Sequence, residues 1–119
     1  MTQILLVVFG GAVGALARHG VSVAAARLLG VAFPWGTLLV NVVGGLAMGL
    51  LAARVGPDQE NTRLLMGVGV LGGFTTFSAF SLETVRLMQS ASASAMLYVA
   101  ASLGLSVGAC WLGLMLGRQ

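Results

Sequence analysis

Four long apolar segments, separated by short polar stretches, constrain this chain more than any other feature of its sequence. They run from about 4 to 29, 35 to 53, 64 to 88 and 95 to 116, and each is near the ~20 residues that a membrane-spanning helix needs. Only 8% of the residues are charged, against about 25% in a soluble domain. The sequence therefore predicts an all-α integral membrane protein, with a single four-helix domain over residues 1–119.

Pairs of glycine four residues apart occur in every segment. They are Gly10 and Gly14, Gly45 and Gly49, Gly69 and Gly73, and Gly104 and Gly108. Small residues at this spacing let helix backbones approach closely in lipid. We therefore expect all four helices to pack tightly along these glycines.

The arginines are divided almost evenly between the two sides that four spans create. One side holds Arg54, Arg63 and Arg118, and the other holds Arg27 and Arg86, with Arg18 nearby. An excess of Lys and Arg on one side normally orients a membrane protein, and here there is almost none. We therefore expect insertion in both orientations and an antiparallel homodimer, with one dominant orientation as the alternative.

The charged residues indicate neither nucleic-acid binding nor catalysis. The net charge of +3 comes without any basic run, so lipid headgroups are the expected partner and nucleic acid is not. No nucleophile-and-base pair or metal-ligand cluster is present, and we expect no enzyme. The acidic residues are Asp58, Glu60 and Glu83. Because none interrupts the first two segments, we expect no buried carboxylate, which disfavours proton-coupled cation export and favours an anion.

Polar side chains inside the apolar segments are candidate site residues, because a polar group in lipid is costly. Asn41 lies near the centre of the second segment, with Thr37 one turn earlier on the same face. In the fourth segment Tyr98, Ser102 and Ser106 recur every four residues and form a row of hydroxyl groups on one face. Bonds between helices, or from the serines to their own backbone, remain open as structural explanations.

The stretch GGFTTFSAF, residues 72–80, interrupts the third segment with weak helix formers. It predicts a break near 72–76, which lipid tolerates only where protein or a bound ion satisfies the freed backbone groups. Carbonyls from two subunits would suit a small hard cation. Beyond the break, Phe77 and Phe80 share a helix face, and their positively polarised ring edges suit an anion. Packing in the core is the alternative role for these rings.

Three motifs resemble those of the Fluc (CrcB) fluoride channels, and the resemblance covers nearly the whole chain. They are GGAVGALARH (10–19), PWGTLLVNVVGG (34–45) and GGFTTFSAFSLET (72–84). The resemblance implies a passive fluoride channel, an antiparallel dual-topology homodimer with two pores, located in the inner cell membrane and reducing fluoride toxicity. It also implies a structural sodium ion, not itself transported, held by the main-chain carbonyls of Gly72 and Thr75.

The same resemblance implies roles for individual side chains. The fluoride pathway would include Asn41, Phe77, Phe80, Tyr98, Ser102 and Ser106. To these we add Thr37, on the same face as Asn41, and Thr76 as expected pathway residues. Arg18 would give the wide vestibule its positive potential, whereas Ala79 departs from the family, which often has a hydroxyl residue there. A small dual-topology multidrug exporter and a structural membrane subunit are the alternative functions. The exporter would need a carboxylate in the first segment, and none is present.

Overall fold

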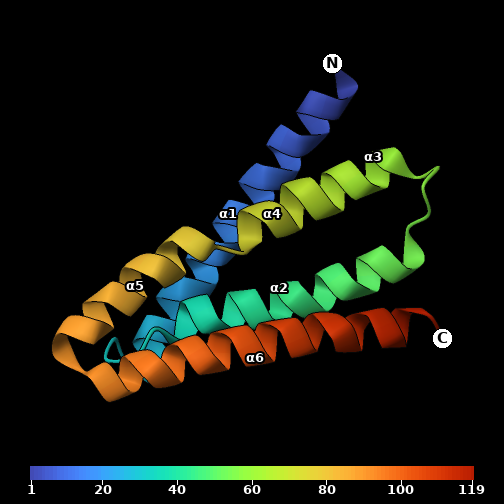
Figure 1. The fold of residues 1–119 in the computed structure, drawn as a ribbon. Coiled ribbons are helices and arrows are strands. Elements are labelled where there is room, and N and C mark those ends of the chain that lie inside the picture. Colours follow the sequence, from blue (N-terminus) through green and yellow to red (C-terminus); the bar gives the residue numbers. More distant parts are fainter.

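The computed structural model describes all residues, 1–119, and is entirely helical (Figure 1). Four helical stretches are long and apolar enough to cross a membrane: α1 (Thr2–Leu29), α2 (Trp35–Arg54), the composite stretch Glu60–Ser90, and α6 (Ser92–Gly117). This confirms the predicted all-α class and the four spans. At about 1.5 Å per residue, the 26 residues of α6 exceed the ~30 Å of a bilayer's hydrocarbon core.

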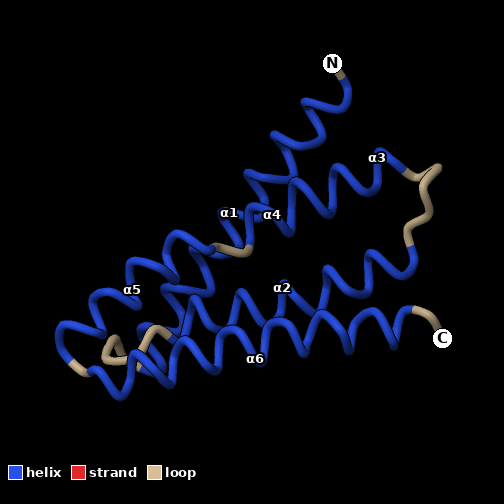
Figure 2. Tube along the Cα trace, viewed as in Figure 1, coloured by secondary structure: helices blue, strands red, loops and turns tan.

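The third span is built from four pieces. They are α3 (Glu60–Thr62), the π-helix η1 (Arg63–Leu71), α4 (Gly72–Phe74) and α5 (Phe77–Ser90). Between α4 and α5 the backbone of Thr75 and Thr76 is extended, with ψ angles of 158° and 125°, and Figure 2 shows this short non-helical link. The sequence predicted an ordinary α-helix in this stretch, and it did not predict the wide turns of η1.

Glycines set how closely the helices pack. The α2 and α6 helices run side by side (Figure 1), and a Cβ added at Gly45 would lie 2.7 Å from the Ser106 carbonyl oxygen. Where α1 crosses the third span, a Cβ at Gly73 would lie 2.6 Å from the Gly11 carbonyl oxygen. The pair at Gly104 and Gly108 differs, because nothing lies within 4 Å of a Cβ there. The expectation of close packing along that pair is therefore wrong within the single chain.

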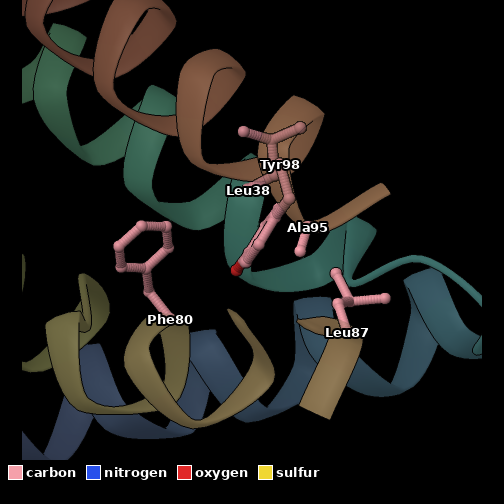
Figure 3. Close-up of a cluster of buried hydrophobic side chains, with 5 residues drawn as sticks. All are labelled: Leu38, Phe80, Leu87, Ala95 and Tyr98. Carbon is pink, nitrogen blue, oxygen red and sulfur yellow. The ribbon is translucent and has the colours of Figure 1, made fainter. Parts of the chain in front are cut away.

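A small core lies between α2, α5 and α6. Its members, shown in Figure 3, are Leu38, Phe80, Leu87, Ala95 and Tyr98. Only 17 of the 119 residues are buried, and large apolar side chains such as Leu16 and Trp111 are well over half exposed. Such an apolar surface suits lipid or a partner subunit rather than water.

Candidate functional site

The link between α4 and α5 is fixed by the side chain of Asn41 in α2. The Asn41 Nδ2 donates to the Thr76 carbonyl oxygen at 2.9 Å, and the Thr76 N–H donates to Asn41 Oδ1 at 2.8 Å. The Thr76 hydroxyl oxygen then accepts from the Ala79 N–H at 3.2 Å and caps the start of α5. One amide therefore satisfies both backbone groups of Thr76, which lies between α4 and α5.

These bonds redirect two backbone donors. In a continuous helix the Thr76 N–H would donate to the Gly72 carbonyl, and the Ala79 N–H would donate to the Thr75 carbonyl. Here the two N–H groups donate to Asn41 and to the Thr76 hydroxyl instead. The carbonyls of Gly72 and Thr75 are thus released from their ordinary helical partners, whereas the Thr75 hydroxyl donates to the Leu71 carbonyl at 2.9 Å.

Arg18 of α1 lies against the same part of the third span. Its Nε donates to the Gly73 carbonyl oxygen at 3.1 Å, and the side chain is half-buried. An arginine inside an apolar segment needs a partner, and here a backbone carbonyl is that partner. A positive charge is therefore held one residue away from the Gly72 carbonyl.

A cavity of about 330 Å³ opens beside the link, between α2, α5 and α6. We call it the groove; its walls include Asn41, Gly44, Gly45, Met48, Thr75, Thr76, Phe77, Phe80, Ser102, Leu103, Ser106 and Cys110. It brings together six of the eight residues expected along the pathway. The two that it does not include are Thr37 and Tyr98.

Two hydroxyl groups and two rings give the groove its chemistry. The Oγ atoms of Ser102 and Ser106 are buried and have no hydrogen-bond partner within the chain. The rings of Phe77 and Phe80 lie 5.5 Å apart, centre to centre, and are tilted by 50°. Phe80 is buried, whereas Phe77 is 75% exposed, so the wall that Phe77 belongs to is open in the single chain.

Thr37 and Tyr98 instead converge on a carboxylate. The Thr37 hydroxyl donates to Glu83 Oε1 at 2.7 Å, and the Tyr98 hydroxyl donates to Glu83 Oε2 at 3.2 Å. Glu83 lies in α5 and is half-buried, and no carboxylate of the chain is fully buried. Sequence reasoning missed this residue, although Glu83 follows Phe80 by one helical turn and is the one acidic residue inside an apolar segment.

This three-residue cluster of Thr37, Glu83 and Tyr98 adjoins the groove. The Tyr98 ring contacts the Phe80 ring at 5.2 Å between centres, and Phe80 is itself part of the groove wall. On its other side Glu83 lines a second cavity, of about 340 Å³, together with Arg86. The cluster therefore lies between the groove and this outer cavity.

Comparison with known proteins gives one consistent result. Residues 5–114 match the family model described as CrcB-like protein, Camphor Resistance (CrcB). A protein of Caulobacter sp. named fluoride-specific ion channel FluC is 54% identical over 124 aligned positions, which cover 100% of this chain and 97% of that protein. Proteins of the same name in Sphingopyxis alaskensis and Caulobacter vibrioides are 52% and 49% identical, with 100% of this chain and 98% of each relative covered. This chain belongs to the CrcB family.

Proposed function

We propose that this chain is the subunit of a fluoride-specific ion channel, through which fluoride leaves the cytoplasm passively and so becomes less toxic. The observation that carries the proposal is the set of full-length relatives named as such channels. Because those relatives are named neither drug exporters nor structural subunits, we adopt the first of the three functions considered above. The four spans make it a multi-pass membrane protein, and we place it in the inner cell membrane.

The groove supplies the donors that a dehydrated fluoride ion needs. An isolated charge moved into a low-dielectric medium costs on the order of tens of kcal/mol in an idealised estimate. The hydroxyl groups of Ser102 and Ser106 have no other partner, and the Asn41 amide keeps a second N–H after bonding to Thr76. These groups replace the ion's water a few contacts at a time, weakly enough to allow its release.

The two phenylalanine rings complete this wall of the pathway. A ring edge carries partial positive charge, so Phe77 and Phe80 favour an anion without the strong binding of a full positive charge. Because the Phe77 ring is 75% exposed, it is available to a pathway whose opposite wall comes from a second subunit. Further along α6, Cys110 lines the same groove and extends the row of small polar groups.

An antiparallel, dual-topology homodimer is the assembly that we propose. The arginine balance between the two sides permits insertion in both orientations. The groove is open on one side in the single chain, and Gly104 and Gly108 leave a face of α6 with no helix against it. Small residues on an unoccupied face allow close approach of a further helix, so this face suits the partner subunit.

A structural sodium ion is the cofactor that we propose, and the residues present fit it. We take Thr75 and Thr76 as the functional break of the third membrane helix, which frees the carbonyl oxygens of Gly72 and Thr75. Carbonyl oxygens are ligands that hard cations accept. Two such oxygens from each subunit would meet at a two-fold axis, and the ion would supply the positive charge that keeps them together without being transported.

Flux from reconstituted protein tests the proposed function. Liposomes loaded with sodium fluoride and containing the purified protein should release fluoride rapidly, as measured with a fluoride electrode, and should retain chloride. Ser102→Ala should slow the release, because it removes a donor from the groove. Ser92→Ala is the matched control, since Ser92 is exposed at the start of α6. Fluoride release no faster than from protein-free liposomes would overturn the proposal.

A further inference from the structure

We propose that Met48 of α2 and Cys110 of α6 form a binding site for a soft, singly charged metal ion, such as silver(I) or copper(I), at one end of the groove. The bound ion closes the groove to other ions. The site itself does not depend on the proposed function, whereas its effect on fluoride release rests on it. The groove thus accepts a second class of ligand, which inhibits the first.

The two sulfur-containing side chains lie at the same end of the groove. Helices α2 and α6 run parallel and in step, because a Cβ added at Gly45 would meet the Ser106 carbonyl oxygen and one at Gly49 would meet the Cys110 carbonyl oxygen, four residues further along both helices. Met48 and Cys110 are the last residues of their helices that line the groove. Met48 is 37% exposed and Cys110 is half-buried, so an ion in the cavity can reach both.

The chemistry of this donor set selects a soft ion. Thiolate and thioether sulfur prefer soft cations, copper(I) among them. Silver(I) and copper(I) bind stably to a pair of sulfur ligands, so Met48 and Cys110 can hold such an ion without a further charged side chain. A structural zinc ion needs a tetrahedral set of ligands, and the chain has no group of three or more His, Cys, Asp and Glu side chains that could supply it. Calcium prefers oxygen ligands, so a soft ion fits the pair best.

The balance of charge selects a singly charged ion. The thiolate is the ligand, so Cys110 loses its proton when the metal binds. The S–H bond breaks, the metal–sulfur bond forms and the proton leaves to water. A singly charged ion and the thiolate then make a neutral pair, and the Met48 thioether adds no charge. A doubly charged ion would leave one positive charge uncompensated in a membrane-spanning segment, which is costly.

Unpartnered hydroxyl groups in the same cavity independently indicate that it takes a ligand. Ser102 is 5% exposed, and its Oγ has no hydrogen-bond partner within the chain. The Ser106 Oγ is likewise buried and unpartnered. Buried polar groups nearly always have a partner, so these two, which line the groove, need one from outside the chain. Ser106 precedes Cys110 by one helical turn, and its hydroxyl oxygen keeps lone pairs that can add a weak third ligand to the ion.

An ion held by both helices obstructs the groove. Met48 and Cys110 belong to two walls of one cavity of about 330 Å³, and an ion bonded to both sulfur atoms joins these walls at the end next to Ser106. Fluoride is a hard anion and coordinates a soft cation weakly, so the bound ion does not relay fluoride by exchange. Fluoride that arrives at this end is therefore kept from the Ser106 hydroxyl group.

Titration calorimetry with silver nitrate, on purified protein in a chloride-free detergent solution, measures the site without any need for conduction. The wild type should bind one silver ion tightly per chain, and Cys110→Ser should lose this binding. Met48→Leu should weaken it by about tenfold or more, because even the indirect supporting partners of a metal contribute about 10–100-fold to its affinity. Met96→Leu, on an exposed face of α6 outside the groove, is the matched control and should keep the wild-type affinity. Equal affinity in Met48→Leu and the wild type would mean that the thiol acts alone, which overturns the inference.

Fluoride efflux from liposomes tests the block. Silver nitrate should stop release by the wild type, with a midpoint that matches the calorimetric affinity, and dithiothreitol should restore release by removing the ion. Met48→Leu should raise this midpoint by the same factor as in calorimetry, with each protein compared to its own silver-free rate. Cadmium nitrate at the same concentration should not block, because its ion is doubly charged. Undiminished release by the silver-bound wild type would overturn the inference. Tight, Met48-dependent silver binding by a protein that releases no fluoride would instead refute the proposed function and leave the metal site standing.

Discussion

Replacing Asn41 with leucine should destabilise the folded chain and abolish fluoride conduction together. The Asn41 amide makes two hydrogen bonds to the Thr76 backbone, at 2.9 Å and 2.8 Å, and leucine has a similar size but no polar atoms. Each backbone group left without a partner costs about 1–3 kcal/mol when buried, or about 2–6 kcal/mol for the two. Because Thr76 is half-buried beside the open groove, water limits the loss, and we expect about 2–3 kcal/mol.

The variant Asn41→Asp separates the effect on stability from the effect on conduction. In Asn41→Asp an oxygen can still accept from the Thr76 N–H, but the bond to the Thr76 carbonyl is lost and two oxygens face each other. The expected loss of about 1–3 kcal/mol concerns one backbone group, and the new negative charge lies in the proposed anion pathway. Asn41→Asp should therefore lose conduction more completely than stability.

Unfolding of the purified protein in detergent, followed against denaturant, measures the stability loss, and fluoride efflux from liposomes measures conduction. Asn61→Leu is the matched control, because Asn61 is exposed in α3. Wild-type stability in Asn41→Leu would refute the reasoning that Asn41 fixes the link at Thr76. Lost conduction with intact stability would assign the amide to the ion pathway alone.

Three further predictions concern the rings, the break and the assembly. Phe80→Leu should lower fluoride flux strongly while costing under ~1.5 kcal/mol of stability, and an equal loss in Phe74→Leu, outside the groove, would show that the rings act only in packing. Gly72→Ala should weaken the sodium dependence of flux. It should do so without a steric clash, since a Cβ there would lie 3.6 Å from its nearest neighbour, the Gly67 carbonyl oxygen. Unchanged sodium dependence would count against the carbonyl site. A cysteine introduced into the 54–63 linker, with Cys110 removed, should be labelled from both membrane faces, and labelling from one face would exclude dual topology.

The spans were predictable from the sequence because apolar length is a property of each segment by itself. The membrane requires about 20 apolar residues for each crossing, and no knowledge of neighbouring helices is needed to count them. The π-helical turns of Arg63–Leu71 were not predictable in this way. Within this stretch Gly69 packs closely against the backbone of Gly10 and Gly11 in α1, and such contacts exist only once the helices have packed.

Glu83 illustrates a different limit. Its position in the last turns of the third apolar segment is equally consistent with a lipid–water boundary, where a carboxylate would be solvated. Only the packed structure shows that Thr37 of α2 and Tyr98 of α6 donate to it. The row of hydroxyl groups on α6 was visible as a four-residue spacing, but the partner of each hydroxyl depends on which helix faces it. The spacing thus predicted the polar face of α6. It did not predict that Ser102 and Ser106 line the groove, whereas Tyr98 bonds to Glu83.

Removal of sodium should distinguish two interactions of the third span: the hydrogen bonds between Thr76 and Asn41, and the proposed sodium site. Within one chain, Thr76 is held by Asn41, a contact that needs no ion, whereas the proposed carbonyl site lies between two subunits. Replacing sodium with a large organic cation should therefore weaken the dimer but leave the Thr76 amide protected from hydrogen exchange. The Ala79 amide, which donates to the Thr76 hydroxyl, should behave in the same way. If both amides lose protection together with the dimer, the ion, rather than Asn41, maintains the break.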